Sequence, residues 1–330
     1  MYILKSDTND AYFNLALEEY LLDNYNDDFF IIDVNEPSII LGVNQNAYEE
    51  INALYVKQSS IKVIRRLSGG GTIFQDYGNL NFSYIYKDDG TDLRDMGKVT
   101  KILAGFLREK LNIDFSFSKN NHLLISGKKF GGYTKLRVKD KILLHSSLVF
   151  SSNKKFLIDA LKLGKAKHPD RALRSTHEQV TSISAHLEEN ISMDKFKDLF
   201  YNYILNVFPD VKEFELSETD KEGVNSLIKE KYSTWEWNYG NEIVHNYKNS
   251  FSSNAGKIEI YLQIEDQKIK HAYFRGDFFS QKSIAEMENL FTDCPYERTH
   301  VHNMVSKLNL ADYIENLDKD EFVNHFFNNN

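Results

Sequence analysis

Residues Ile64 to Ser83 read IRRLSGGGTIFQDYGNLNFS, and this stretch decides the fold. One predicted strand ends at Ile64, and the next begins at Gly71. Three consecutive glycines between two strands lose backbone entropy and add no packing, so they indicate a close approach of the backbone to a ligand. Their N–H groups can bind an anion, and Arg65 and Arg66 add positive charge beside them.

The glycine stretch differs from the two common phosphate-binding motifs. No Lys-Ser/Thr pair follows it, as in a P-loop, and its spacing is not the dinucleotide G-x-G-x-x-G pattern. Chemistry alone therefore leaves two interpretations open, an anion site and a tight hairpin turn.

Length and composition limit the class of protein. The 330 residues suffice for one large domain and a smaller one. A net charge of −8 argues against a broad nucleic-acid surface. The single cysteine, Cys294, excludes an internal disulfide and predicts a reducing compartment. Because no stretch approaches the ~20 apolar residues of a membrane span, and the N-terminus lacks a signal-peptide layout, we expect a cytoplasmic protein that binds neither membranes nor nucleic acid.

Hydrophobic periodicity predicts mixed helices and strands up to about residue 245. The predicted helices cover 14–22, 48–58, 92–111, 154–163, 193–207 and a segment from 217. The predicted strands cover 1–5, 29–34, 38–42, 61–64, 81–86, 122–126, 129–139, 142–151 and 213–216, with a hairpin turn at Asp140-Lys141. After the run Trp235-Glu236-Trp237-Asn238 the pattern changes to a hairpin of 257–264 with 268–274, then helices from 280 and near 299. We therefore expect two domains, 1–245 and 246–330.

A second informative stretch is Ser126 to Gly132, SGKKFGG, with His145-Ser146-Ser147 across the predicted hairpin. A lysine flanked by glycines can lie over a phosphate and stabilise negative charge. Two adjacent lysines are also typical of a solvated hairpin edge, and chemistry alone favours that interpretation.

Together these motifs resemble those of lipoate–protein ligases. The first stretch is similar to the family signature RRxSGGG-x-V-x-HD-x-GN-x-N-F-S, and the second to G-x-K-[IV]-[SC]-G followed by a strand ending H-H-G-T-L-L. The resemblance covers residues 10–245 well and the remainder loosely. It implies an α+β fold: a mixed, mostly antiparallel sheet flanked by helices, like the biotin/lipoate ligase catalytic domain, plus a small α+β accessory domain.

The resemblance also implies a set of site residues. Lys129 falls on the catalytic lysine, and Lys128 does not. The residues implied to bind lipoate or lipoyl-adenylate are Asn14, Glu18, Arg66, Ser68, Gly69, Gly70, Gly71, Ile73, Gln75, Asn79, Asn121, His145 and Ser147. Asn121 would help to hold adenine, while Arg66 and the Gly70 and Gly71 amides would hold carboxyl or phosphoryl oxygens. No metal ligand is implied.

The implied activity has two steps. Lipoate is first adenylated with ATP and Mg²⁺, and the lipoyl group then passes to a lysine of a carrier, either a 2-oxoacid dehydrogenase acyltransferase subunit or the glycine cleavage H protein. Two alternatives stay open: a lipoyl or octanoyl acyltransferase without adenylation, and a non-catalytic lipoyl- or adenylate-binding paralogue. Cys294 lies far from the motifs, which disfavours a cysteine nucleophile. ATP dependence of carrier acylation would separate the three.

Several positions depart from the family pattern. Gln75 replaces a histidine, Val43 an arginine, His122 an aspartate and Asp33 an aromatic residue, while Tyr133 places a ring in the lysine strand, beside the expected site. We expect these departures to narrow the range of acyl chains or carriers without changing the fold. Since an unpaired carboxylate buried against an aliphatic chain is unfavourable by several kcal/mol, Asp33 should point away or pair with a basic group.

Overall fold

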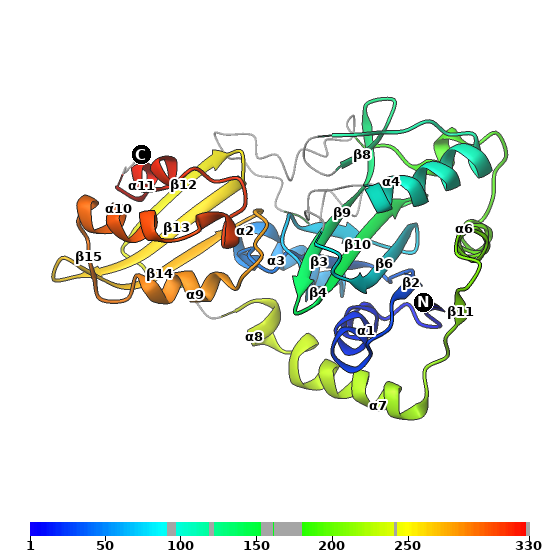
Figure 1. Cartoon of the computed structure of the whole chain (residues 1–330), viewed down its shortest axis with the longest axis horizontal. Coiled ribbons are helices and arrows are strands. Elements are labelled where there is room, and N and C mark those ends of the chain that lie inside the picture. Colours follow the sequence, from blue (N-terminus) through cyan, green and yellow to red (C-terminus); the bar gives the residue numbers. More distant parts are fainter. Residues whose placement is uncertain (91–96, 119–121, 153–160, 162–179, 241–242, 328–330) are drawn as a thin grey trace.

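The computed structural model describes residues 1–90, 97–118, 122–152, 161, 180–240 and 243–327 (Figure 1). Asn121 and nearly all of the predicted helix at 154–163 lie outside these residues. Among the described residues, no helix is long and apolar enough to cross a membrane.

The larger part of the chain is built on an eight-stranded sheet with strand order β11-β1-β2-β6-β10-β9-β8-β7. Its strands are β1 (Tyr2–Lys5), β2 (Phe29–Asp33), β6 (Asn79–Lys87), β7 (Ser116–Phe117), β8 (His122–Ile125), β9 (Lys128–Val138), β10 (Lys141–Val149) and β11 (Lys212–Glu213). Only β11, β1 and β2 pair in parallel, and every pair from β2 to β7 is antiparallel. The prediction of a mixed, mostly antiparallel sheet is confirmed.

A separate three-stranded sheet, which the sequence analysis did not distinguish, holds the glycine stretch. Its order is β4 (Lys62–Arg65), β3 (Ser38–Leu41) and β5 (Ile73–Gln75). Both β4 and β5 pair with β3, in parallel and antiparallel respectively. Residues 66–72 therefore form a loop whose two ends are fixed to the same central strand.

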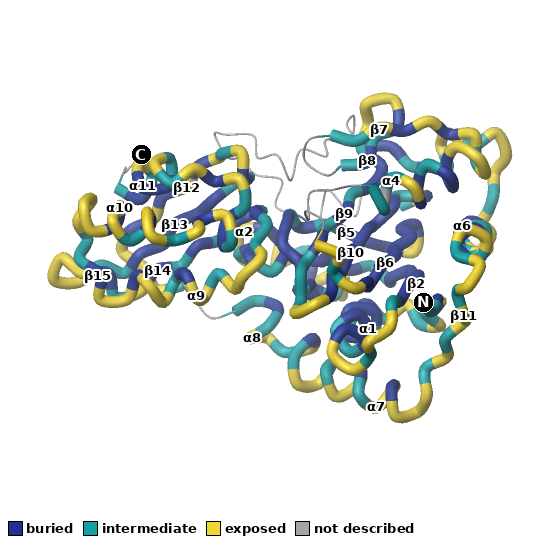
Figure 2. The backbone as a smooth tube through the Cα atoms, in the orientation of Figure 1, coloured by how far each residue is buried: buried dark blue, intermediate teal, exposed yellow. Residues whose placement is uncertain are grey.

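Helices bury both faces of the large sheet. One face packs on α4 (Gly97–Ala104), its π-helical continuation η1 (Gly105–Lys110) and α6 (Met193–Val207). The other packs on α1 (Ala11–Asn24), α7 (Glu218–Leu227) and the π-helical turn η3 (Ile228–Tyr232). Side chains alternate between these two faces along β6. Phe82 and Tyr84 pack in the core with α4 and α6, whereas Ile85 packs in the core with α1 and α7. Figure 2 shows this burial along the central strands.

Some predicted boundaries were wrong for identifiable reasons. The helix predicted at 48–58 is two short helices, α2 (Ala47–Glu50) and α3 (Ala53–Gln58), because the Asn52 side chain caps a new start by accepting from the Tyr55 N–H. The hairpin turn is formed by Lys139-Asp140, one residue before the predicted Asp140-Lys141, because Lys141 already pairs with Val138 in the ladder. The helix predicted from 217 begins after the Ser217 cap, and α6 matches its prediction.

The C-terminal part has its own core, and every buried member of that core lies at or after Tyr247. Its sheet contains β12 (Tyr247–Ser253), β13 (Gly256–Glu265), β14 (Lys268–Gly276) and β15 (Cys294–Pro295), in that order. Its helices are α9 (Ile284–Leu290), α10 (Arg298–Lys307) and α11 (Lys319–Phe327), with the 3₁₀ turn η4 (Leu310–Asp312). Figure 1 shows these helices over one face of the sheet. The sequence predicted the β13–β14 hairpin but neither β12 nor α11.

Candidate active site

The glycine loop is braced from within by Arg66. Its Nη2 donates to the carbonyls of Gly69 (2.6 Å) and Gly71 (3.0 Å), and its Nε donates to Ser68 Oγ (3.2 Å). Burial lowers the pKa of the guanidinium to about 10, and it stays charged at neutral pH. Among the described residues, no carboxylate forms an ion pair with Arg66. The same arginine therefore shapes the loop and keeps a positive charge beneath it, which the Glu18 carboxylate supports from a distance without an ion pair.

Two glycines allow the loop to lie against the end of β3. A Cβ on Gly42 would sit 1.9 Å from the Gly70 carbonyl oxygen, so no larger residue fits there. Gly70 has φ +89°, in the region that favours glycine. The Val43 N–H also donates to the Ser68 carbonyl (3.0 Å), which fixes the start of the loop.

Arg65, the neighbouring arginine, has a purely internal role in this structure. Its Nη1 donates to the carbonyls of Gly42 (2.9 Å) and Gln45 (2.7 Å), while Nε and Nη2 donate to those of Trp237 (2.9 Å) and Asn238 (2.8 Å). Arg65 thus ties α8 (Trp235–Asn238) to the segment that follows β3. The positive charge that the sequence placed on both arginines is available to a ligand only near Arg66.

The C-terminal part of the chain rests directly on the glycine loop. The Gly70 N–H donates to the Phe278 carbonyl (3.3 Å), and a Cβ on Gly69 would meet the same oxygen at 2.6 Å. A second contact runs from the Gly276 N–H to the Asn44 carbonyl (2.9 Å). In this arrangement the Gly70 amide, expected to hold an anion, already has a protein partner.

Lys129 is the half-buried member of the lysine pair, whereas Lys128 is exposed. Burial, and to a lesser extent the nearby Arg66 charge, lower the pKa of Lys129 to about 8. His122, at the start of β8, is kept neutral because burial and the Lys129 charge lower its pKa to about 3. The Lys129 carbonyl accepts from the Thr181 N–H (2.8 Å), so the backbone at this position is fixed.

Tyr133 does not lie beside the site, contrary to the expectation from sequence. The β8–β9 ladder shifts register so that Leu124 pairs with Lys129 and Leu123 with Gly131, which leaves Phe130 as a bulge. The bulge reverses the alternation of side chains, so Phe130 and Tyr133 both enter the core shared with α4 and α6.

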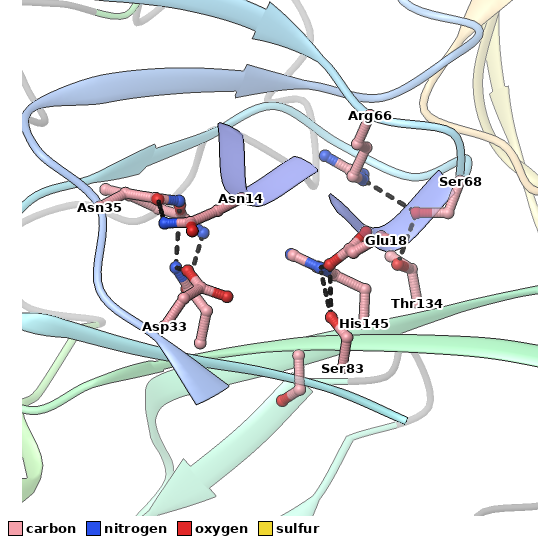
Figure 3. A network of polar contacts seen from close by, with 12 residues as sticks. Asn14, Glu18, Asp33, Asn35, Arg66, Ser68, Ser83, Thr134 and His145 are labelled. Atoms are coloured by element: carbon pink, nitrogen blue, oxygen red, sulfur yellow. Dashed lines mark hydrogen bonds and ion pairs between the residues drawn. The ribbon is translucent and has the colours of Figure 1, made fainter. Parts of the chain in front are cut away.

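A chain of buried polar side chains lies between α1, β5 and the large sheet (Figure 3). Asn14 Nδ2 donates to Asn35 Oδ1 (2.8 Å), and Asn35 Nδ2 donates to Gln75 Oε1 (2.7 Å). Gln75 Nε2 donates to Asn81 Oδ1 (2.9 Å), and Asn81 Nδ2 donates to Asp33 Oδ1 (2.8 Å). Asn81 Nδ2 also donates to Gln75 Oε1 (3.3 Å), and the chain ends at the Asp33 carboxylate.

Asp33 is 3% exposed, and burial raises its pKa to about 6. Its hydrogen-bond partner is the neutral Asn81 amide and not a basic group, so this part of the expectation for Asp33 was wrong. Two departures from the family pattern, Gln75 and Asp33, are therefore joined through Asn81.

A second buried group surrounds His145. Its Nδ1 lies 2.7 Å from Glu18 Oε1, and Ser83 Oγ hydrogen-bonds the same carboxylate oxygen. Burial lowers the pKa of His145, but the Glu18 carboxylate outweighs burial and raises the pKa above its ordinary value. Beside this group, Ser68 Oγ and Thr134 Oγ1 are 2.7 Å apart and join the glycine loop to β9 (Figure 3).

Several of the predicted site residues come together in three groups. The structure brings together Asn14 and Gln75 in the amide chain, Glu18 with His145, and Arg66 with the loop residues 68–71. Asn79 instead shapes a turn, where its Oδ1 accepts from the Asp76 N–H (3.1 Å), and Ile73 packs half-buried on the α1 core. Ser147 is buried on the same face of β10 as His145, and its Oγ has no partner among the described residues.

The sequence analysis missed Asn35, Asn81, Ser83 and Thr134 as members of the site. Asn81 and Ser83 could have been found, because they alternate with buried apolar residues in NLNFS and so share one face of β6. Nothing local marks Asn35, which reaches Gln75 only through the tertiary fold.

No group of three or more His, Cys, Asp or Glu side chains that could hold a metal occurs in the described part of the chain. Mg²⁺ commonly binds through substrate phosphates with few protein carboxylates, so we assign it no residues.

Comparisons with known proteins match nearly the whole chain. The family description "Lipoyl protein ligase A/B catalytic domain" matches residues 10–205, and "Bacterial lipoate protein ligase C-terminus" matches residues 242–326. Lipoate-protein ligase LplJ of Bacillus subtilis is 34% identical over 327 residues, which cover 98% of each chain.

Two solved structures are also similar. Plasmodium falciparum LipL1 in complex with lipoate has a TM-score of 0.79 at 21% identity, covering 98% of this chain and 97% of the other. A bipartite lipoate protein ligase of Thermoplasma acidophilum, described with its E2 lipoyl domain, has a TM-score of 0.63 at 27% identity, covering 74% and 98%. The fold is that of these proteins.

Proposed function

The chain belongs to the lipoate–protein ligase family, and from this premise we propose that it adenylates lipoate with ATP and transfers the lipoyl group to a lysine of a carrier domain. The carrier would be an acyltransferase subunit of a 2-oxoacid dehydrogenase or the glycine cleavage H protein. The T. acidophilum relative is described with a lipoyl domain, which supports this class of partner. The single cysteine supports a reducing compartment such as the cytoplasm.

One observation carries the proposal: Arg66, which braces the glycine loop, and Lys129, which is near Arg66, are two cations without an ion pair to a described carboxylate. Arg66 and Lys129 are close enough for the Arg66 charge to lower the pKa of Lys129. Neither forms an ion pair with a described carboxylate. Two cations without an ion-pair partner among the described residues, beside a glycine loop, favour an anionic ligand, and ATP and the lipoate carboxylate are both anions.

In the first step, a lipoate carboxylate oxygen attacks the α-phosphorus of ATP, and the bond to pyrophosphate breaks. Lys129 would stabilise the charge on the α-phosphoryl oxygens, and the Gly71 N–H and, once freed from Phe278, the Gly70 N–H would bind an oxygen. In the second step, the uncharged amine of a carrier lysine attacks the acyl carbon, the bond to AMP breaks, and the amine proton leaves. Mg²⁺, when bound with ATP, would offset phosphate charge.

Acyl transfer without adenylation would need a nucleophile on the enzyme. Cys294 lies in β15, within the core of the C-terminal part, and burial raises the pKa of its thiol. A buried thiol with a raised pKa is a poor nucleophile. The thiol of Cys294 is therefore disfavoured as the nucleophile, whereas a lysine nucleophile and the non-catalytic alternative are decided by experiment.

The test incubates the protein with lipoate, MgATP and a panel of purified carrier domains, followed by intact-mass measurement of each carrier. We expect a lipoyl mass increase on at least one carrier, dependent on ATP, with AMP released. Acylation without ATP would favour the acyltransferase. Lipoate binding with neither AMP release nor carrier modification would favour the binding paralogue and overturn the proposal.

A further inference from the structure

Lys129 lies beyond the end of the ladder that joins β10 to β9. That ladder ends at the pair Leu148–Gly131, two residues from Lys129. On the opposite edge of β9, Lys129 still pairs with Leu124 of β8. The edge that β10 has left is taken by Val180, which forms a parallel bridge with Lys129. The backbone of the proposed catalytic lysine is therefore held on both edges, although the large sheet itself covers only one of them.

Thr181 completes the contact on this second edge. Its backbone N–H donates to the Lys129 carbonyl (2.8 Å), and the residue is 6% exposed. Its side-chain Oγ1 lies 2.8 Å from Nε2 of His186, and the two atoms share a hydrogen bond. Because the backbone and the side chain of Thr181 both have partners, this one residue links His186 to the lysine backbone.

A short turn holds His186 in reach of Thr181. The 3₁₀ turn η2 (Ile183–His186) begins two residues after Thr181, and Ile183 is completely buried in the core with α4 and α6. The Ser184 N–H donates to the carbonyl of Phe150, the residue that follows β10 (3.0 Å). The turn is therefore attached to the large sheet independently of Lys129, which gives His186 a fixed position from which to hold Thr181.

We propose that Thr181 and His186 are positioning residues for Lys129, and that the hydrogen bond between their side chains sets where the lysine amine lies during adenylation. This deepens the proposed function and rests on it. Both residues act through the lysine backbone and not on the reacting atoms. A cation stabilises the charge that develops on a phosphoryl group only when it is held at the right distance, and a displacement of about 1 Å can cost on the order of a hundredfold in rate.

The pH profile separates this role from a contribution to stability alone. Burial lowers the pKa of Lys129 to about 8, and an amine released from its position gains water, which raises the pKa toward the ordinary value of lysine. The charged and titratable neighbours are Arg66, with a pKa of about 10, and His122, with a pKa of about 3, so neither titrates near pH 8. A variant that is merely less stable loses active protein but keeps the same pH midpoint.

The test measures lipoate-dependent exchange of pyrophosphate with ATP across the alkaline limb of the pH profile. Thr181→Val and His186→Leu each remove the shared hydrogen bond. We expect kcat to fall by roughly tenfold in each, with KM for lipoate and ATP within about twofold of wild type and a higher pH midpoint. Thr181→Ser and His186→Gln are the matched controls, since each keeps a hydrogen-bonding group on the side chain, and both should retain most of the rate.

His186 is exposed, so His186→Leu tests the hydrogen bond without altering the core. The double variant Thr181→Val/His186→Leu should be no slower than the slower single variant, because both changes remove the same hydrogen bond. Additive losses in the double variant, or a lower rate with an unchanged pH midpoint, would overturn the inference while wild-type exchange still supports the proposed function. Absence of exchange in the wild-type protein would overturn the proposed function, and the inference with it.

Discussion

The Gly70 N–H donates a hydrogen bond to the Phe278 carbonyl, so the C-terminal part of the chain occupies a donor of the glycine loop, which we propose binds the anionic substrates. A phosphate or carboxylate oxygen cannot bind this N–H until the Phe278 contact breaks. We therefore expect the C-terminal part to move away from the loop during the two-step reaction.

Gly69→Ala tests this contact. The added Cβ would lie 2.6 Å from the Phe278 oxygen, while Gly69 itself has no positive φ. We expect weaker docking, seen as faster hydrogen exchange at residues 276–281, with the loop fold retained. Gly42→Ala is the contrasting variant, because its Cβ would meet Gly70 within the large domain and distort the loop itself. Unchanged exchange in a folded Gly69→Ala protein would contradict the contact.

Removing residues 246–330 should impair adenylation more than transfer from preformed lipoyl-adenylate, because the contact involves the phosphate-binding loop. Both steps are measured on the truncated protein after its folding is checked by circular dichroism. Equal loss of the two steps in a folded truncation would mark the C-terminal part as a folding partner only.

The sequence predicted features that local spacing determines better than contacts between side chains that are distant in the sequence. The glycine loop and the Lys129 register are local features, and local spacing defines them. The amide chain depends instead mostly on contacts between residues 21 to 48 positions apart, such as Asn14 with Asn35 and Asn81 with Asp33. The bulge at Phe130 could not be predicted either, because a one-residue shift in pairing leaves no mark on the sequence pattern.

Lys129→Ala should abolish adenylate formation, and Lys128→Ala should leave most of it. Lys129 is half-buried beside Arg66, while Lys128 is exposed on the same strand. Because the pKa of Lys129 is lowered to about 8, its positive charge is lost as the pH rises through that value. Lipoate-dependent pyrophosphate exchange should therefore decline above about pH 8. Loss of activity in Lys128→Ala alone would reverse the assignment.

Arg65→Lys should destabilise the protein strongly although both side chains are cationic. The guanidinium donates hydrogen bonds to the carbonyls of Gly42, Gln45, Trp237 and Asn238 at once. A single ammonium group cannot reach all four of these oxygens. Leaving several buried carbonyls unpaired should lower the free energy of unfolding by about 3 kcal/mol or more. Arg108→Lys is the control, since Arg108 is exposed and contacts only the exposed Asp114 among described carboxylates. Equal urea midpoints for the two variants would refute this role.

Asp33→Asn should stabilise the protein at pH 8 but not at pH 4. Burial raises the pKa of Asp33 to about 6 in the folded state, so the folded protein favours the protonated form. Stability is therefore lost as the pH rises from about 4 to about 6, and the loss stays constant above that range. Asparagine is neutral throughout and can still accept from Asn81. We expect a gain of up to about 3 kcal/mol at pH 8 by urea unfolding, with exposed Asp114→Asn as the neutral control. A gain of the same size at both pH values would contradict the titration.

Gln75→His with Asp33→Trp should widen the range of acyl chains that the protein accepts. The Gln75 side chain accepts a hydrogen bond from Asn35 and donates one to Asn81. A neutral imidazole also has one acceptor and one donor, so Gln75→His alone should keep these two hydrogen bonds. Asp33→Trp replaces a buried carboxylate with an apolar ring, which removes the acceptor of Asn81 but gives an aliphatic chain a compatible surface. We therefore expect the single tryptophan variant to be less stable, and the double variant to raise kcat/KM for octanoate relative to lipoate. The measurement is AMP release over a series of saturated and sulfur-containing acids. A folded double variant with the wild-type ratio would show that Asp33 and Gln75 support the fold of this region without setting acyl range.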